Sequence, residues 1–474
     1  MVFSSLPFQF FFLPLFFIAY FAFRQRKARN IVLLVFSLFF YAWGEPFYVI
    51  LMIFSIVANY LFAVAIDKAH GASKQKKAKI EMIAAVAVNL ALIGAFKYAD
   101  FFINIFTAIA GTEPISLNIP LPIGISFYTF QILSYVIDVY QKKTAVQKNI
   151  LFLGAYLCGF PQLIAGPIVR YETIAKELEQ REENLTDFAE GLRRFTAGLA
   201  KKVLVANVMA EVCDGILAKY SDGLAGSIGA LGMWFAILAY TLQIYYDFSG
   251  YSDMAIGLGR MMGFFYLENF NYPYISKSVT EFWRRWHISL STIFRDYVYI
   301  PMGGNRVKTL RWIFNMAVVW LLTGLWHGAS WTFVLWGAYF GSLLIFEKLV
   351  LKDALSKLPV LGHIYAIAAF MFGWVIFRAE SVSQIGEILS ALFGARGAGN
   401  ALALAENGLL KPGHIAAMAV GILCCVPISR KIKGFLEKSQ KTAYIIDAAS
   451  VCALVLCIIM LAQGAYNPFI YFRF

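Results

Sequence analysis

The sequence has too few charged residues for a protein that folds in water. Asp, Glu, Lys and Arg make up 15% of its 474 residues, whereas about 25% is usual in soluble domains. Hydrophobic residues reach 60% and recur in long runs along the whole chain, which excludes a soluble enzyme with one anchoring helix. The composition therefore predicts an integral membrane protein in which the membrane domain is the whole chain.

Two further signals are missing, a cysteine framework and a cleavable signal peptide. The six cysteines lie inside apolar stretches and form neither a Cys-x-x-Cys pair nor a cysteine–histidine cluster. We therefore expect no metal site and no disulfide framework. No basic residue precedes the first apolar run, and the first positive charge follows that run at Arg24. We expect a retained span there.

Acidic residues are scarcer than basic ones, and the formal net charge is +13. The basic residues cluster between apolar runs, at 24–29, 68–79, 170–202 and 430–441. The positive-inside rule places these four segments on the cytoplasmic side, with both termini outside. The excess of positive charge is therefore a topology signal, and no nucleic-acid partner is expected.

The apolar runs predict an all-α polytopic membrane protein with about 11–12 transmembrane helices. The run 149–169 is an exception because basic segments flank it on both sides, so we expect a re-entrant or in-plane segment. The segment 170–202 is expected to form a cytoplasmic helix, and 247–311 an interfacial or cytoplasmic segment. We expect a single transmembrane domain over 1–474, without repeats or a separate soluble domain.

The segment 281–297 has cationic residues at regular intervals. Aromatic and aliphatic residues recur at helical spacing on one side. The residues that follow the same spacing on the opposite side are Arg284, His287, Ser291 and Arg295. We expect one helix at a membrane boundary, with its polar face toward water or a polar tunnel. Two interpretations remain open: an interfacial anchor that contacts lipid phosphates, or a cationic wall for an anionic donor.

A glycine turn and a second histidine follow this segment. Gly303 and Gly304 allow close backbone approach, and Arg306 offers a planar fork for phosphate. His327 lies in an otherwise apolar stretch bracketed by glycines, where an ionisable side chain suggests a function. With an unperturbed pKa of about 6.5, imidazole is the usual general base near neutral pH. The alternative is a neutral histidine that is hydrogen-bonded between helices.

Three acidic residues also lie within apolar or mixed stretches, namely Asp138, Asp247 and Asp253. Two roles are open for them. They could orient a histidine or balance the arginines, or they could hold neighbouring helices together through polar contacts. The sequence does not rank these roles.

Long blocks of the chain resemble the membrane-bound O-acyltransferases. The matching blocks are EFWRRWHISLS at 281–291, IPMGGNR at 300–306, WHG at 326–328, YDFSGYSDMA at 246–255, PQLIAGPI at 161–168 and NPFIYFRF at 467–474. Within the family, the blocks are similar to the branch of alginate O-acetyltransferase membrane subunits. The resemblance covers essentially the whole chain, and the Gly-Gly-Asn-Arg continuation favours this branch over teichoic-acid D-alanyl transfer.

The resemblance implies a ring of tilted helices around a central funnel, with His327 as the catalytic histidine and His287 as a supporting one. It implies transfer of acetyl from cytoplasmic acetyl-CoA across the bacterial cytoplasmic (inner) membrane for O-acetylation of an exported or cell-wall polysaccharide. A secreted, hydrolase-like acetyltransferase is the expected partner, and membrane lipid surrounds the enzyme. No cofactor is expected to be permanently bound.

In this interpretation His327 abstracts the proton of the acceptor hydroxyl, while His287 and Ser291 position donor or acceptor. The residues expected to bind the donor are Arg284, Ser291, Arg295 and Arg306, whose guanidinium groups would hold phosphates. Three alternatives remain: D-alanyl transfer to teichoic acid, a transporter of polysaccharide or lipid-linked sugar with His327 in a proton relay, and a scaffold that does not need His327.

Overall fold

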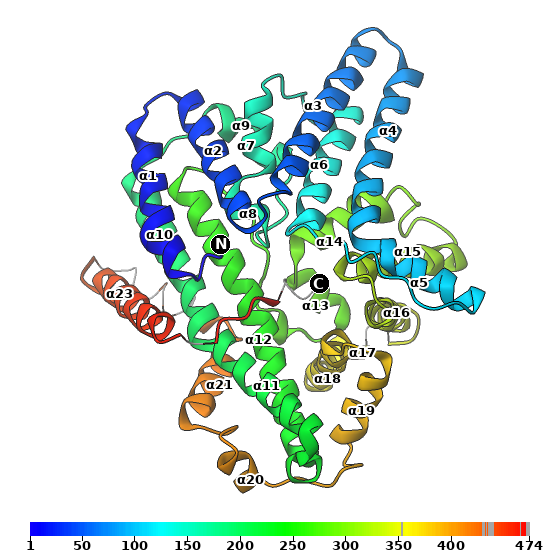
Figure 1. The fold of residues 1–474 in the computed structure, drawn as a ribbon, viewed down its shortest axis with the longest axis vertical. Helices are drawn as coiled ribbons and strands as arrows, with labels where there is room; N and C mark the ends of the chain where they lie inside the picture. The colour runs from blue at the N-terminus through cyan, green and yellow to red at the C-terminus, as the bar shows by residue number, and fades with distance from the viewer. Residues whose placement is uncertain (352–353, 429–431, 433, 435–439, 465, 471–474) are drawn as a thin grey trace. The chain divides into compact units, whose positions relative to one another are not determined.

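The computed structural model describes residues 1–351, 354–428, 432, 434, 440–464 and 466–470. Within this part of the chain the regular elements are helices and no strand occurs (Figure 1), which confirms the all-α prediction. The expected basic loop at 430–441 lies largely outside the described residues, and so does 471–474 of the C-terminal block.

Several helical runs are long and apolar enough to cross a membrane. The seven in the described part are Val49–Gly71, Gln75–Ala110, Leu185–Met261, Thr309–His327, Trp331–Leu351, Pro359–Arg378 and Tyr444–Ala462. Shorter apolar helices occur at Phe8–Ala22, Val382–Leu392 and Pro412–Cys424. The 77-residue run from Leu185 to Met261 is long enough for more than one crossing of about 20 residues, because its helices follow one another without a loop. The prediction of a multi-pass helical membrane protein is confirmed.

The chain forms two compact units. Unit 1 comprises Met1–Phe195 with Met254–Leu267, and unit 2 comprises Thr196–Asp253 with Glu268–Phe474. Two of the unit boundaries fall within the helices α10 (Leu185–Ala200) and α12 (Ala225–Met261), and the third lies after Leu267.

Helix α12 continues through residues that we expected to begin an interfacial segment at 247. Residues 241–259 are buried without exception. Glycines explain this burial, because a Cβ at Gly250 would lie 2.7 Å from the carbonyl oxygen of Gly198 on α10. Only a glycine contact lets the two backbones approach so closely. The first part of 247–311 is therefore a packed helix and not an interfacial segment.

In unit 2, aromatic rings hold the helices around α13 (Val279–Arg285) together. The α-helices of the described part of unit 2 also include α11 (Asn207–Lys219), α14 (Ile288–Phe294), α15 (Thr309–His327), α16 (Trp331–Phe346), α17 (Ala354–Lys357), α18 (Pro359–Arg378), α19 (Val382–Leu392), α20 (Ala401–Glu406), α21 (Pro412–Cys424) and α23 (Gln440–Ala462), with parts of α10 and α12. The Trp283 ring lies 4.9 Å from the rings of Trp320 on α15 and Phe340 on α16. Phe282 contacts Phe370 on α18 at 5.2 Å. Offset and edge-on ring contacts of this kind add to the stability gained by burial.

In unit 1, a bundle of helices surrounds a short buried segment. The α-helices of unit 1 are α1 (Leu13–Ala22), α2 (Arg26–Gly44), α3 (Val49–Gly71), α4 (Gln75–Ile93), α5 (Ala99–Ala110), α6 (Ile125–Tyr140), α7 (Ile150–Leu157), α8 (Phe160–Leu163) and α9 (Tyr171–Glu179), with parts of α10 and α12. Residues 153–169 are all buried, and the Phe160 ring lies 5.0 Å from that of Phe16. Helices α7 and α8 are too short to cross a bilayer, which needs about 20 residues. The structure here agrees with the expected re-entrant or in-plane segment.

An acidic side chain ties two of the basic segments of unit 1 together. Glu183 forms ion pairs with Arg26 and Arg29 of α2, the second with an N–O distance of 2.6 Å. Arg181 lies 3.4 Å from the same carboxylate. The segment 24–29 and the part of 170–195 around Glu183 therefore lie on one side of this unit.

The turn between α3 and α4 lies on that same side. His70, in the last turn of α3, contacts the carbonyl oxygen of Tyr140 at 3.0 Å. Tyr140 ends α6, which packs against α9 of the polar segment 170–202. At the other end of α3, the Tyr48 hydroxyl donates to the carbonyl of Pro120 at 2.8 Å. The segment around 111–120 is therefore at the opposite end of the unit (Figure 1).

This arrangement predicts the sidedness of two exposed positions. In a background with the exposed cysteines Cys424 and Cys452 replaced by Ala, Gln75→Cys should react with a membrane-impermeant maleimide only in inverted vesicles. Glu113→Cys should react only from the outside of intact spheroplasts, because the basic segments remain in the cytoplasm. External labelling of Gln75→Cys would contradict the topology.

Candidate active site

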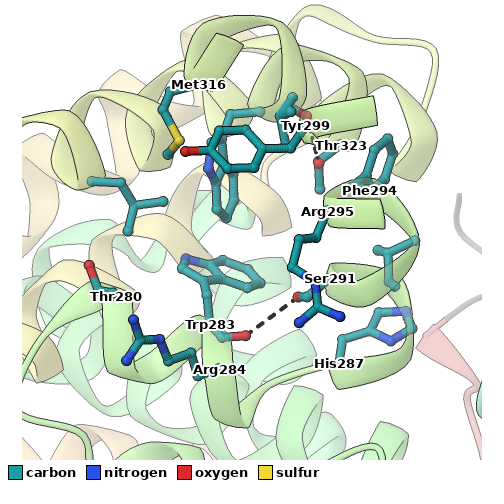
Figure 2. Close-up of a pocket in the computed structure, with 14 residues that line it drawn as sticks. Thr280, Trp283, Arg284, His287, Ser291, Phe294, Arg295, Tyr299, Met316 and Thr323 are labelled. Carbon is teal, nitrogen blue, oxygen red and sulfur yellow. Dashed lines mark hydrogen bonds between the residues drawn. The ribbon is translucent and has the colours of Figure 1, made fainter. Parts of the chain in front are cut away.

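A cavity of about 230 Å³ lies within unit 2 at the junction of α13, α14, α15 and α16. Its wall is largely aromatic and aliphatic and includes Trp283 and Trp320. The expected site residues that also line it are Arg284, His287, Ser291 and Arg295 (Figure 2). The structure thus brings the polar face expected for 281–297 to one cavity. His327 and Arg306 are not among the described residues that line the cavity.

The expected continuous helix over 281–297 is wrong. Helix α13 ends at Arg285 and α14 begins at Ile288, because His287 adopts a left-handed backbone conformation with φ 44° and ψ 54°. Such a conformation costs a non-glycine residue about 1–3 kcal/mol. The side chains of both short helices still reach the same cavity, since the break turns α14 without moving it away from α13.

Hydrogen bonds from Asn269 hold this break. Its backbone carbonyl accepts from the backbone N–H of Ile288 at 3.0 Å, and its Oδ1 accepts from Ser289 N at 3.2 Å and Ser289 Oγ at 2.9 Å. The same Oδ1 lies 3.2 Å from His287 Nδ1, and Asn269 Nδ2 donates to Ser252 Oγ at 3.2 Å. Sequence analysis missed Asn269, because no spacing rule connects it to a residue 18 positions later.

His287 is a buried histidine in aromatic surroundings. Its ring lies 4.6 Å from that of Phe248, edge to face, and 5.9 Å from that of Trp326. Burial lowers the pKa of the His287 imidazole to about 3, because desolvation disfavours the charged form. The ring is therefore neutral at physiological pH, and one of its two nitrogens carries a lone pair that can accept a hydrogen bond.

Two arginines bring positive charge to the cavity. Arg284 and Arg295 are both exposed, and Figure 2 shows the Arg295 guanidinium beside Ser291 and His287. Arg295 also binds Asp296, with Nε 2.6 Å from Oδ1, and this hydrogen bond raises the pKa of Arg295. Because both guanidinium groups are exposed, they can bind an anion at the cavity, and neither is a buried unpaired charge when no anion is bound.

Arg306 lies outside the cavity lining, on the turn that follows α14. Gly303 and Gly304 adopt φ values of 102° and 56°, which side chains rarely permit. Asn315 of α15 donates to the carbonyl oxygen of Gly304 at 3.2 Å and so fixes this turn. Arg306 itself is exposed, and the structure does not bring it to the other expected donor-binding residues.

His327 ends α15 and is surrounded by aromatic rings. Its ring lies 5.0 Å from those of Trp326 and Trp336 and 5.1 Å from that of Phe377. It follows Thr323, which lines the cavity, by one helical turn. The flanking glycines serve packing, because a Cβ at Gly324 would lie 2.2 Å from the carbonyl oxygen of a residue on α16.

A second residue missed by sequence analysis fixes α13. The buried carboxylate of Glu347, which follows α16, accepts from Thr280 N at 2.9 Å and Thr280 Oγ1 at 2.5 Å. It also accepts from Val279 N. These contacts satisfy N–H groups that a helix leaves open in its first turn. Because Thr280 lines the cavity, Glu347 fixes the wall that carries Arg284.

The buried carboxylates of α12 pair with lysines. Lys202 and Asp247 form an ion pair at 2.8 Å, with side chains 3% and 1% exposed, and Lys201 pairs with Asp253 at 2.6 Å. The attraction between two paired charges offsets the free-energy cost of removing both of them from water. For Asp247 and Asp253 the structure therefore supports helix-to-helix contacts over orientation of a histidine.

Comparison with known proteins agrees with the resemblance in sequence. The model of the membrane-bound O-acyltransferase family matches residues 8–385. A probable alginate O-acetylase of Azotobacter vinelandii is 45% identical over 398 residues, 83% of this chain and 78% of its own length. That of Pseudomonas putida is 38% identical over the full length of both chains. The peptidoglycan O-acetyltransferase of Helicobacter pylori is 34% identical over 84% of this chain and 80% of its own. The chain therefore belongs to the membrane-bound O-acyltransferase family and is a multi-pass membrane enzyme of acyl transfer.

Proposed function

We propose that this enzyme transfers an acetyl group from cytoplasmic acetyl-CoA across the bacterial cytoplasmic membrane for O-acetylation of an exported or cell-wall polysaccharide resembling alginate. A secreted, hydrolase-like acetyltransferase is the proposed partner that receives the acetyl group or completes the transfer. The names of the relatives, O-acetylase and O-acetyltransferase, support acetyl as the acyl group. The observation that carries the proposal is the cavity that combines two exposed arginines with a neutral, buried histidine.

The cavity suits the thioester end of a coenzyme A ester. Its volume of about 230 Å³ is below the roughly 300–1,000 Å³ of ordinary small-molecule sites, which favours a short acyl group over a fatty chain. Guanidinium groups bind phosphate through charge-assisted hydrogen bonds. Arg284 and Arg295 would therefore hold donor phosphates, with Ser291 placed to contact the donor between them and His287. Arg306 would add a phosphate contact outside the cavity.

The proposed chemistry is a single acyl transfer. The acceptor oxygen attacks the thioester carbonyl as His327 takes the hydroxyl proton, and the C–S bond then breaks. His327 returns the proton to the departing thiolate, so the products are an acetyl ester and free coenzyme A. His287 would orient the acceptor hydroxyl, because a strongly lowered pKa makes it a poor proton carrier but leaves it a good hydrogen-bond acceptor.

The proposal predicts transfer of radiolabel in proteoliposomes that contain the enzyme, its partner and polysaccharide. Acetyl-labelled coenzyme A supplied on the cytoplasmic side should yield labelled ester on the opposite side, whereas label in the coenzyme A moiety should stay behind. Ester formation from a D-alanyl thioester in place of acetyl-CoA would favour the teichoic-acid alternative. Movement of polysaccharide without any ester would indicate a transporter.

A second prediction concerns His327. His327→Gln should lower kcat by about 10²–10⁴-fold while donor binding stays nearly unchanged, because glutamine cannot accept the proton. Thermal melting of the purified variant checks its packing among the surrounding rings. His70→Gln, in unit 1, is the matched control and should keep normal turnover. Near-normal turnover of His327→Gln would make that histidine structural.

A third prediction concerns the donor. Arg284→Ala and Arg295→Ala should each raise the KM for acetyl-CoA and leave acceptor dependence alone. A charge-assisted contact is worth about 1.5–3 kcal/mol, and the exposure of both guanidinium groups places the loss at the lower end, roughly tenfold in KM. Arg306→Ala should have a smaller effect because Arg306 lies outside the cavity. Unchanged donor titrations for Arg284→Ala and Arg295→Ala would return the segment to a lipid-contacting anchor.

A further inference from the structure

We infer that Asn269 is a positioning residue that locks His287 in the tautomer with its hydrogen on Nδ1, so that Nε2 presents a lone pair to the acceptor hydroxyl. The tautomer follows from geometry alone. Its use in catalysis rests on the function proposed above, in which His287 serves acetyl transfer.

The orientation of the Asn269 amide is set by a group that can only donate. The backbone N–H of Ser289 points at one atom of this amide at 3.2 Å, and a backbone N–H requires an acceptor. That atom is therefore the oxygen, Oδ1. The other amide atom, Nδ2, lies 3.2 Å from Ser252 Oγ on α12, which can accept from it. These two contacts decide the amide orientation.

The amide orientation decides the histidine tautomer. Oδ1 of Asn269 also lies 3.2 Å from His287 Nδ1, and an oxygen acceptor at that distance requires a hydrogen on Nδ1. The Ser289 hydroxyl lies 3.4 Å from the same nitrogen, but it donates its proton to Asn269 Oδ1 at 2.9 Å. Nδ1 is therefore the donor of the ring, and the lone pair of the neutral imidazole is on Nε2.

The same residue also holds the backbone of His287 in place. The Asn269 carbonyl accepts from Ile288 N at 3.0 Å, which stabilises the left-handed turn. Asn269 is 1% exposed, so water does not compete for these bonds. The charged groups on the cavity that His287 lines are Arg284 and Arg295, and a guanidinium group donates hydrogen bonds but does not accept them.

Histidine-selective ¹⁵N solid-state NMR of the enzyme in lipid tests the tautomer directly. The chain has only five histidines, and His287→Gln identifies the signals of His287 by their loss. In the wild type these signals should show a protonated Nδ1 and an unprotonated Nε2 throughout pH 6–8. A protonated Nε2 with a bare Nδ1 would overturn the inference.

Variants at 269 separate positioning from packing. Asn269→Leu should give His287 a mixture of tautomers and lower kcat/KM by about 10–100-fold, as loss of an orienting partner does elsewhere. Asn269→Asp keeps an acceptor for Nδ1–H, so it should retain the Nδ1–H tautomer and most activity at alkaline pH. It should also take up a proton on His287 at higher pH than the wild type, because the carboxylate favours the charged ring. Asn89→Leu, a buried asparagine paired with Asn59 in unit 1, is the control and should leave the His287 signals unchanged.

The possible outcomes distinguish the tautomer assignment of His287 from its proposed use in catalysis. If Asn269→Leu changes the tautomer but not kcat/KM, the proposed catalytic use of His287 fails while the tautomer assignment stands. If Asn269→Leu does not fold, the wild-type spectrum and Asn269→Asp still decide the tautomer. Equal loss of activity at every pH in Asn269→Asp and Asn269→Leu would reduce Asn269 to a packing residue and overturn the inference.

Discussion

The left-handed turn at His287 is the constraint on which the cavity depends. It ends α13 and starts α14 in a new direction, so that Arg284 of the first helix and Ser291 of the second face one space. The backbone cost of such a turn is about 1–3 kcal/mol, and the hydrogen bonds of Asn269 offset it. The polar wall of the cavity is therefore held by one buried amide together with the Glu347 carboxylate at the start of α13.

The second constraint is that charges must be paired, because an unpaired charge among membrane-spanning helices raises the free energy of the folded protein. Lys202 and Asp247 show how a helix with a polar sequence can still be buried, since each charge meets its partner at 2.8 Å. Close backbone approach at Gly198 and Gly250 adds to this packing. Low hydropathy therefore made residues 247–259 look interfacial, although contacts remote in sequence bury them.

Hydropathy and helical spacing predicted the features of the fold that depend on residues close together in the sequence. They identified a multi-pass helical membrane protein and placed Arg284, His287, Ser291 and Arg295 on one face. These patterns could not predict the break between α13 and α14 at His287, because the hydrogen bonds that stabilise the break come from Asn269 in a different segment. The role of Glu347 could not be predicted either, because its partners Val279 and Thr280 also lie in a distant segment of the sequence. The aromatic surroundings of His327 likewise come from several helices, so the sequence showed its apolar context but not its distance from the cavity wall.

The proposed function requires that the cavity behind Arg284 and Arg295 holds the acyl donor beside His287. Electron cryomicroscopy of the enzyme in lipid nanodiscs, bound to a thioether analogue of acetyl-CoA that cannot transfer its acyl group, tests this claim directly. We expect phosphate density within hydrogen-bond distance of Arg284 and Arg295, and the acetyl carbonyl in the cavity next to His287. An analogue bound elsewhere, with lipid filling this cavity, would contradict it.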